Sequence, residues 1–434
     1  MYRLKTFIML GILLIGFNQL ALSQRVDLET YLNQLQHNSS HIKQSKNNIE
    51  QAEQDTKMAK AALLPSAGIE SSYRRDMNRI YMYISEVESG GLIPNNFPMN
   101  FYNNISANAV VQQSIYNPVA LANHKLAKLS KEYTELSHFE LEDELKRQGT
   151  ILFFQALYVK ESIAVAQQNT DLALQQWNQL QDLFEEGYVS EFQTKQAEIY
   201  YKQTLPLLIE TEKMYKTLLS ELQLLAGESP HNNFDIEGSL KEIAPADNHI
   251  DSTLDENKTI KLLNKQIAIN KQQIQERKAA YLPQLKASVG YQFDAYDDDF
   301  KFDNINNLGF AQLTLRIPIA SGGFNRAQKQ KSLLSLKASQ IEKDHKKNEL
   351  LKELYNSELN LNLASEKIKT EMEVITLSKK ELEISEEKIK LGLVTNLELK
   401  EIRNALLQSE LNLINAYLDY KIAQTNIQKI AEKK

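Results

Sequence analysis

Strict alternation of apolar and polar residues marks four stretches of the chain as β-strands with one apolar face. Polar residues such as Ser72 and Gln312 occupy the intervening positions. A period of two residues is that of a half-buried strand, so the runs predict two β-hairpins, at about 66–116 and 284–319. The edge of a soluble sandwich would show the same pattern, but the chain supplies no further strands to complete one. The apolar positions are Ala67, Ile69 and Tyr73; Ile105, Ala107, Ala109, Val111 and Ile115; Leu285, Ala287, Val289, Tyr291 and Phe293; and Ala311, Leu313, Leu315, Ile317 and Ile319.

The rest of the pattern predicts helices. Two stretches, 119–186 and 324–391, contain no proline, and Gly149 is the only glycine in either of them. At a rise of about 1.5 Å per residue, each would form a helix roughly 100 Å long, too long for a compact domain. The C-terminal segment shows spacings of three and four in turn, which are typical of a coiled-coil seam. The seam positions are Leu399, Ile402, Leu406, Ser409, Leu413, Ala416, Tyr420, Ala423, Ile427 and Ile430.

Two halves of the chain repeat the same plan. "KAALLP" begins at Lys60 and "KAAYLP" at Lys278, 218 positions later (278 − 60). Each long helical stretch ends at a glycine, in "EEGYVSEFQ" and "KLGLVTNLE", and these glycines are 205 positions apart (392 − 187). Each half therefore reads as helix, strand, strand, long helix, tight turn, helix, which indicates a tandem duplication.

The resulting division of the chain has four parts. Turn-forming residues join the two repeats, and the fold class is mainly α with a small β part. The predicted parts are a signal peptide at 1–23, a first repeat at 24–227, a linker at 228–254 and a second repeat at 255–434.

The N-terminal segment is typical of a secretory signal peptide. Arg3 and Lys5 precede an apolar run at 7–17, and small residues lead to a cleavage site predicted before Gln24. A membrane anchor or a buried helix is the alternative, but a run of about 11 residues is shorter than the roughly 20 needed to span a bilayer. We therefore expect an exported protein, which would enter a membrane only through its strands.

Composition excludes several kinds of site. The chain has no cysteine, so disulfides and thiolate metal sites are excluded. Its net charge of −6 offers no basic stripe for nucleic acid. His37 and His41 share a helix face, but a metal site would need further ligands, and a solvated surface is the preferred interpretation. The carboxylates of 297–299 could hold a cation, although a solvated turn is favoured. No catalytic set and no cofactor site is predicted.

Repeated motifs at the element junctions resemble the TolC family of outer-membrane efflux proteins. The chain ends a helix in Leu-Pro before a strand, carries "IYNP" at 115–118 and "IASGG" at 319–323 after the second strand of each hairpin, and has Gly-x-Val-Ser/Thr at both helical turns. Two copies occur in the same order, at offsets of 218, 204 (319 − 115) and 205. The resemblance covers essentially the whole chain after the signal peptide.

Four strands are too few to close a membrane barrel, for which about eight is the smallest common number. The chain must therefore oligomerise if its strands cross a membrane. The resemblance implies a homotrimer in the outer membrane, with a twelve-stranded barrel that continues as a helical tunnel into the periplasm. It implies a channel without chemistry of its own, working with a periplasmic adaptor and an inner-membrane pump for efflux or type I secretion.

The resemblance also implies two sites at the helical turns. In the family these turns meet the adaptor, and the matching residues here are Gly187, Tyr188, Val189 and Ser190 in the first repeat and Gly392, Leu393, Val394 and Thr395 in the second. The alternative is that they only cap helices.

Family members also place acidic residues six and nine positions after the second glycine. Those positions hold Glu398 and Glu401, which share one helix face. Three copies would form an entrance ring of six carboxylates, whose repulsion would raise their apparent pKa values. The first-repeat counterparts are Gln193 and Gln196. A solvated helix face is the alternative.

Two rival functions make different predictions. A soluble periplasmic adaptor or spacer would be extracted without detergent and would leave the hairpins unexplained. An exported enzyme would lose a hydrolytic activity when His37 and His41 are changed. The aromatic residues near the hairpin loops are predicted to form the girdle of a barrel, with ordinary strand packing as the alternative. They are Tyr73, Tyr81, Tyr83, Phe101, Tyr102, Tyr291, Phe293 and Tyr296.

Overall fold

The computed structural model describes residues 24–83, 96–230, 234–241, 254–390 and 393–431. The predicted signal peptide, 1–23, lies outside the described residues. The helices are α2 (Leu28–Asn38), α3 (Ser40–Ala61), α4 (Pro118–Glu185), α5 (Glu191–Ala226), α6 (Lys258–Ala279), α7 (Phe324–Lys390) and α8 (Asn396–Ala431), with a 3₁₀ turn at Leu254–Glu256. The strands are β1 (Gln24–Val26), β2 (Ser66–Arg75), β3 (Tyr81–Tyr83), β4 (Asn96–Pro98), β5 (Asn103–Tyr116), β6 (Phe234–Ile236), β7 (Gln284–Asp297) and β8 (Asn304–Arg316). The predicted class, mainly helical with a small β part, is confirmed.

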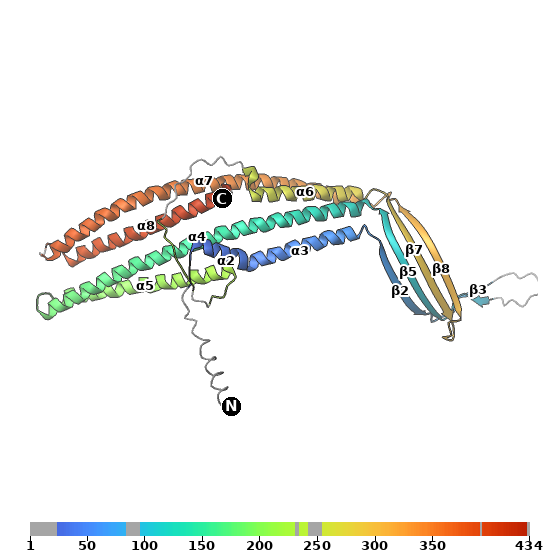
Figure 1. Cartoon of the computed structure of the whole chain (residues 1–434), viewed down its shortest axis with the longest axis horizontal. Coiled ribbons are helices and arrows are strands. Elements are labelled where there is room, and N and C mark those ends of the chain that lie inside the picture. The colour runs from blue at the N-terminus through green and yellow to red at the C-terminus, as the bar shows by residue number, and fades with distance from the viewer. Residues whose placement is uncertain (1–23, 84–95, 231–233, 242–253, 391–392, 432–434) are drawn as a thin grey trace, which may run out of the picture. The chain divides into compact units, whose positions relative to one another are not determined.

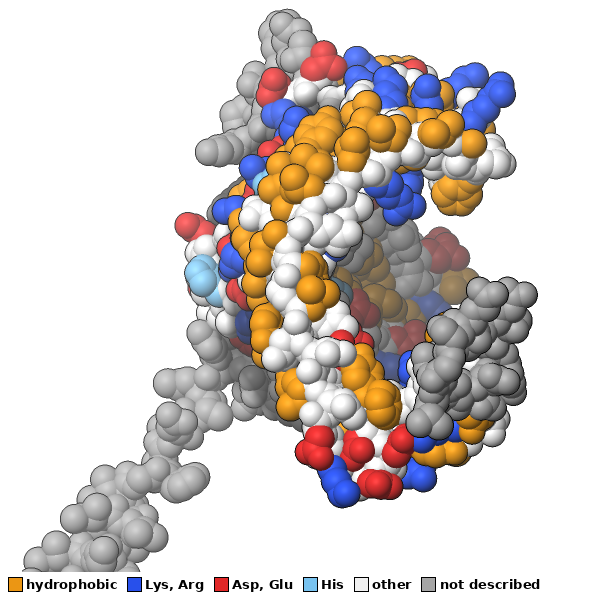
Figure 2. All heavy atoms as spheres, turned by 90° about the vertical axis from the view of Figure 1, so that its right-hand side faces the viewer, with side chains coloured by type: hydrophobic (Ala, Val, Ile, Leu, Met, Phe, Trp, Pro, Cys, Tyr) orange, Lys and Arg blue, Asp and Glu red, His pale blue; other side chains and the backbone are white. Residues whose placement is uncertain are grey.

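The four long strands form one antiparallel sheet in the order β2-β5-β7-β8 (Figure 1). Its register keeps the alternation in step, because Ile69 is paired with Ala109, Ala109 with Tyr291, and Val111 with Val289. Paired residues share a face, so up to the register shift at Ser114–Tyr116 the odd-numbered positions of the four strands form a single, mainly apolar face. Figure 2, which looks onto the strand end of the chain, shows hydrophobic side chains strung along the sheet, with charged side chains gathered at one end. The predicted hairpins are confirmed.

One position on the even-numbered face explains a glycine inside a strand. Gly290 of β7 is paired with Phe310 of β8, and a Cβ atom added to Gly290 would lie 2.6 Å from the ring of Phe310. The ring therefore occupies the space that a side chain would need, and it covers the backbone that the glycine leaves bare.

Compactness divides the chain differently from the sequence repeats. Unit 1 consists of residues 1–47, 136–261 and 344–434, and unit 2 of residues 48–135 and 262–343. Each unit draws segments from both repeats. Both long helices pass from one unit into the other, since α4 enters unit 1 at Leu136 and α7 at Asp344.

The core of unit 1 packs α2 against α4 and α5. Tyr31 and Phe153 are fully buried, with ring centroids 5.9 Å apart. The hydroxyl of Tyr31 donates a hydrogen bond of 3.1 Å to the carbonyl of Leu222, which gives this polar atom the partner that burial demands. The most apolar part of α4 is long enough by composition to cross a membrane. Its buried residues Phe153, Ala156 and Leu157 instead belong to this core.

A short parallel pairing of β1 and β6 fastens the N-terminal strand to the linker in unit 1. Lys160 of α4 donates to both carboxylate oxygens of Asp235 in β6, at 2.9 and 3.0 Å. The hydroxyl of Tyr215 in α5 donates to the same carboxylate at 2.5 Å. Asp235 therefore joins two helices to the strand pair.

Unit 2 carries the sheet and the helices that lead into it. Its helices are joined by polar contacts: Asn270 of α6 donates to the hydroxyl of Ser339 in α7 at 2.7 Å. Gln272 of α6 donates to the carbonyl of Ala122 in α4 at 3.1 Å. These buried or half-buried hydrogen bonds fix the register of helices whose apolar stripes alone could slide.

Candidate functional site at the helical tips

The turn after α4 is closed by a glycine in a left-handed conformation. Gly187 has φ +81°, and its N–H donates to the carbonyl of Phe184 at 3.0 Å. The N–H of Tyr188 donates to the carbonyl of Leu183 at 2.8 Å. This pair of bonds is a Schellman motif, which needs a residue at positive φ and so favours glycine. A Cβ atom at Gly187 would meet nothing within 4 Å, so backbone conformation alone restricts the position.

The helix that follows begins with a reciprocal capping box. The hydroxyl of Ser190 accepts from the N–H of Gln193 at 3.4 Å, and the side chain of Gln193 accepts from the N–H of Ser190 at 3.0 Å. Two backbone donors that the first turn of α5 would leave unpaired are thereby satisfied. Ser190 caps α5, as the sequence predicts.

The second turn has the same construction where it is described. Gly392 lies outside the described residues. The N–H of Leu393 donates to the carbonyl of Lys388 at 3.1 Å, the counterpart of the bond from Tyr188 to Leu183. The hydroxyl of Thr395 accepts from the N–H of Glu398 at 3.2 Å, and the Glu398 carboxylate accepts from the N–H of Thr395 at 2.7 Å. The two repeats thus cap their returning helices with equivalent boxes.

Both turns expose apolar side chains. Tyr188 is 76% exposed and Leu393 is 70% exposed. Phe192 and Leu397, in the first turns of α5 and α8, are also exposed. Large apolar side chains at a chain reversal stabilise nothing within one copy, and grouped exposure of this kind is typical of an interaction surface.

The predicted entrance residues differ in their surroundings. The carboxylate of Glu398 also accepts from the hydroxyl of Thr395 at 2.9 Å. Hydrogen bonds from the Thr395 N–H and hydroxyl lower the pKa of Glu398, which opposes the rise expected from repulsion in a ring. Glu401 is exposed and has no partner in the part of the chain that the structure describes. Gln193 and Gln196 lie beside a small cavity of about 230 Å³ together with Tyr200 and Lys400.

The sequence did not predict a network of hydrogen bonds around Arg403, which lies in α8 near the turns. The side chain of Arg403 is only 11% exposed and donates to Gln176 of α4 at 2.6 Å and to Glu386 of α7 at 2.9 Å. It therefore connects three helices. One feature of the sequence could have indicated it: Arg403 lies between the seam positions Ile402 and Leu406. A charged side chain that is buried beside a seam needs polar partners.

Tyr200 makes a second link between α5 and α8. Its hydroxyl donates to Asn404 at 3.0 Å and approaches Asn169 of α4 at 3.3 Å. The ammonium group of Lys400 lies 4.9 Å from the centre of the Tyr200 ring, within the range of a cation–π contact. The two coiled coils of unit 1 are thus held together by polar contacts near the tips.

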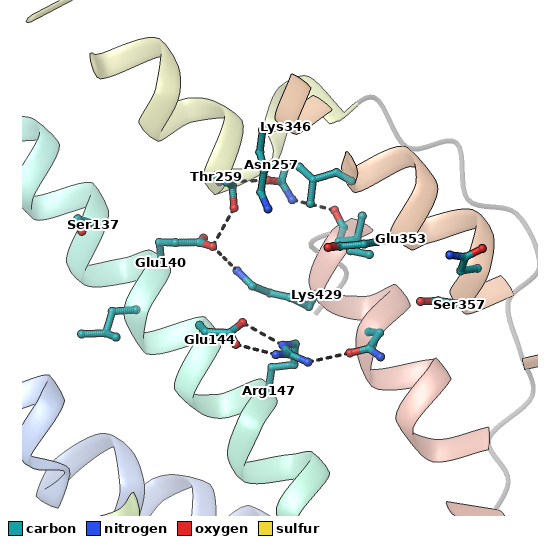
Figure 3. Close-up of a pocket in the computed structure, with 15 residues that line it drawn as sticks. Ser137, Glu140, Glu144, Arg147, Asn257, Thr259, Lys346, Glu353, Ser357 and Lys429 are labelled. Carbon is teal, nitrogen blue, oxygen red and sulfur yellow. Dashed lines mark hydrogen bonds and ion pairs between the residues drawn. The ribbon is translucent and has the colours of Figure 1, made fainter. Parts of the chain in front are cut away.

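A larger cavity of about 720 Å³ opens between α4, α6, α7 and α8 in unit 1 (Figure 3). The carboxylate of Glu140 accepts from Lys429 and from the hydroxyl of Thr259, each at 2.9 Å. Glu144 accepts two hydrogen bonds from Arg147, at 2.9 and 2.6 Å. Glu144 and Arg147 both lie on α4, whereas Lys429 comes from α8 and Arg147 also donates to Asn426 of α8 at 2.9 Å, so the cavity wall joins α4 to α8.

The remaining candidate chemistry has structural explanations. His37 contacts its own helix through a 2.8 Å bond between Nδ1 and the carbonyl of Asn33. Asp297 accepts the backbone N–H groups of Asp298 and Phe302, and Asp298 pairs with Arg79. Asp297 and Asp298 therefore hold their loop in place. The sequence had predicted only a solvated turn there. Within the described residues, no group of three or more His, Cys, Asp or Glu could hold a metal.

Comparison with known proteins agrees with this architecture. Residues 249–431 match the family described as "Outer membrane efflux protein". No curated protein matches the chain. Solved structures show the same fold. The outer membrane protein VceC from Vibrio cholerae has a TM-score of 0.75 at 14% identity, over 93% of this chain and 95% of that one.

Two outer membrane channels are similarly close in fold. CmeC from Campylobacter jejuni has a TM-score of 0.79 at 13% identity, over 93% of this chain and 85% of that one. MtrE from Neisseria gonorrhoeae, in its open state, has a TM-score of 0.72 at 13% identity, over 93% of this chain and 88% of that one. The predicted TolC-like resemblance is confirmed: the chain has the fold of these outer-membrane channels, and its residues 249–431 match the family of outer membrane efflux proteins.

Proposed function

We propose that this protein is a trimeric exit duct through the outer membrane, which passes substrates from an inner-membrane pump and a periplasmic adaptor to the cell exterior. The observation that carries the proposal is a four-stranded sheet with one continuous apolar face and two unpaired edges, in a chain with the fold of outer-membrane channels. A soluble adaptor would have no use for such a sheet.

The edges of the sheet argue for three copies. β2 and β8 each have one neighbour in the sheet, so each leaves a row of backbone N–H and C=O groups unpaired. In lipid, every such group costs several kcal/mol by an order-of-magnitude estimate. Pairing of β8 with β2 of the next copy removes all edges when the ring closes, and three copies of four strands give a barrel of twelve.

The apolar face is suited to lipid. Ile69, Val289 and Leu313 lie on it and are 82%, 60% and 72% exposed. The opposite face carries polar residues such as Ser72, which donates or accepts at 2.9 Å with Ser106. A barrel with the odd-numbered face outward would place apolar side chains in the membrane and polar ones around water.

A helix of unit 1 has an unpartnered apolar row that a second copy would cover. Leu363, Leu377 and Ile384 of α7 are 55%, 69% and 43% exposed and recur at multiples of seven residues. That spacing places them on one helix face, as in a coiled-coil seam. Neighbouring copies that pack against this row would extend the barrel as a helical tunnel.

The tips supply the contact with the adaptor and the tunnel entrance. The exposed apolar residues of the two turns, with Gly187, Val189, Ser190, Val394 and Thr395, are suited to dock hydrophobic adaptor tips. Glu401 is the freer of the two acidic residues and is the main candidate for setting ionic preference at the entrance. Glu398 combines a capping role with its charge.

Cell fractionation tests the assignment. We expect the chain to remain in the outer-membrane fraction after salt and carbonate washes and to require detergent for release, because the apolar sheet face would be in lipid. A pulldown with the tagged protein is expected to recover a periplasmic adaptor and an inner-membrane pump. Release by osmotic shock without detergent would favour the soluble adaptor instead.

A further inference from the structure

We propose that Arg75, at the loop end of the sheet, binds a phosphate group of a lipid in the outer leaflet of the membrane. This inference rests on the proposed function, because it requires the apolar face of the sheet to meet lipid. It is carried by the position of Arg75 on that face, its lack of an acidic partner among the described residues, and the aromatic and amide groups that orient it.

Arg75 lies where the apolar face ends. It is the last residue of β2 and is paired with Asn103, in the final row of the pairing between β2 and β5. Residues two apart in a strand share a face, so Arg75 lies on the same side as Ile69 and Tyr73. β2 starts just after the helix α3, and Arg75 is at its other end. In the proposed orientation, with the helices in the periplasm, this end reaches the outer leaflet.

Neighbouring arginines of this loop region are already neutralised. Arg74, on the even-numbered face, pairs with Asp76 at 3.0 Å. Arg79 pairs with Asp298 and lies 4.5 Å from the ring centre of Tyr102. Among the described residues, Arg75 has no carboxylate within ion-pair distance. A permanent cation next to an apolar surface therefore remains to be compensated.

The surroundings of Arg75 hold its guanidinium in place. Its Nη1 donates to Oδ1 of Asn103 at 3.4 Å, and the group lies 5.7 Å from the ring centre of Phe300. Asn103 is fully buried and is itself fixed, since its Nδ2 donates to the carbonyl of Asp298 at 3.0 Å and its Oδ1 accepts from Tyr73 at 2.8 Å. A stacked guanidinium still presents N–H groups in its plane, which suits bidentate binding of phosphate.

The loop that supplies Phe300 is held in an unfavourable conformation. Phe300 and Phe302 have φ of +59° and +53°, which is rare for bulky residues. The Asp297 carboxylate accepts from the N–H groups of Lys301 and Phe302 and so maintains the loop. This loop conformation places the centre of the Phe300 ring 6.2 Å from the centre of the Tyr73 ring. Strain retained at a surface loop points to a role for the side chain it places.

These features together fit a lipid headgroup better than a free anion. Tyr73 and Phe300 are 51% and 57% exposed and flank the cation, and aromatic rings of this kind settle at the interface between lipid and water. A phosphate at the headgroup level would meet Arg75 while the acyl chains cover the apolar positions below it. In the proposed orientation, Arg75 lies at the depth of the lipid phosphates.

Lipid binding to the purified full chain tests the inference. The probes are lipid A, which carries phosphates, and a diacylglycerol, which carries none and should bind wild type and variants alike. Each is added to the protein in an uncharged detergent, and the bound copies are counted by native mass spectrometry. We expect Arg75→Gln to weaken the binding of lipid A by roughly tenfold, as for loss of one charged hydrogen-bonding contact. Arg75→Lys keeps the positive charge but loses the paired N–H groups of the guanidinium. Its affinity for lipid A should lie between those of wild type and Arg75→Gln. Arg74→Gln is the matched control and should bind like wild type.

Each other outcome overturns the inference. Equal binding of lipid A by wild type and Arg75→Gln, or equal losses in Arg74→Gln, would remove the site. Loss of the trimer in Arg75→Gln with unchanged lipid binding would assign Arg75 to a carboxylate of a second copy. Competition by millimolar inorganic phosphate as effective as that by lipid would indicate a free-anion site. The oligomeric state of wild type separates the two proposals: a trimer without a lipid effect refutes this inference alone, whereas a monomer refutes the proposed function as well.

Discussion

The side chain of Asn257 joins the end of the last helix to the start of another, because its Nδ2 donates a 3.0 Å hydrogen bond to the carbonyl of Ile430. Its Oδ1 accepts from the N–H of Thr259 at 3.0 Å. One buried amide thus caps the N-terminus of α6 and satisfies a last-turn carbonyl of α8. The side chain of Asn257 therefore connects the C-terminal end of α8 to the N-terminal end of α6 in unit 1.

Replacement of Asn257 by alanine should weaken this connection between α8 and α6 and lower the stability of the protein. The change leaves a buried donor and a buried acceptor without partners, and we expect a loss of about 1–2 kcal/mol. The midpoint of helix melting, followed by circular dichroism in detergent, should fall. Asn356→Ala, on the exposed face of α7, is the control and should melt like wild type. Equal midpoints for the two variants would contradict the capping role.

The anchor at Asp235 predicts a dependence of stability on pH. Burial disfavours the charged form, but hydrogen bonds from Tyr215 and Lys160 outweigh it and the pKa of Asp235 is lowered. A group with a depressed folded pKa stabilises the protein above its unfolded pKa, about 3.9, and loses that contribution as pH falls through the folded value. Asp235→Asn should therefore be less stable than wild type at pH 7. The difference in melting midpoint should shrink below about pH 4. A difference that is constant from pH 3 to pH 7 would show that the charge is not responsible.

Gly187 offers a test of the tip that separates conformation from bulk. A Cβ atom fits there, but φ of +81° disfavours a β-branched residue by about 1–2 kcal/mol. Gly187→Val should reduce efflux of a fluorescent dye in cells while the assembled protein stays in the outer membrane. Gly187→Asn, which tolerates the left-handed conformation, should retain most of the efflux. If valine and asparagine give the same efflux as glycine, the shape of this turn does not matter for docking.

The two entrance glutamates should respond differently to loss of charge. Gln193 closes the first capping box, so Glu398→Gln is expected to keep the second box while removing its charge. Glu401 has no such role, and Glu401→Gln changes charge alone. Six carboxylates around a narrow pore would favour cations, so we expect lower cation selectivity in each variant and the largest loss in the double variant. Reversal potentials in planar bilayers measure this. Values identical to wild type in the double variant would leave these residues as a solvated helix face.

Local patterns were enough to predict the sheet and the caps, but not the contacts between distant helices. The alternation around Val111 and Val289 predicted both the strands and their shared face, because a period of two leaves one register that keeps apolar residues together. The glycine and the serine of the first turn likewise predicted its cap. The partners of Arg403, in contrast, lie on α4 and α7, and no spacing along the chain relates them. The carboxylate of Asp235 is similarly satisfied by two helices that only the fold brings near.

The mass of the assembled protein in mild detergent tests the central claim most directly. The chain from Gln24 onward, extracted from the outer membrane, should elute as a single species of three copies when light scattering and the detergent contribution are measured together. Three copies are expected because the unpaired edges of β2 and β8 are satisfied only in a closed ring. A monodisperse monomer under the same conditions would contradict the account, since four strands cannot form a channel alone.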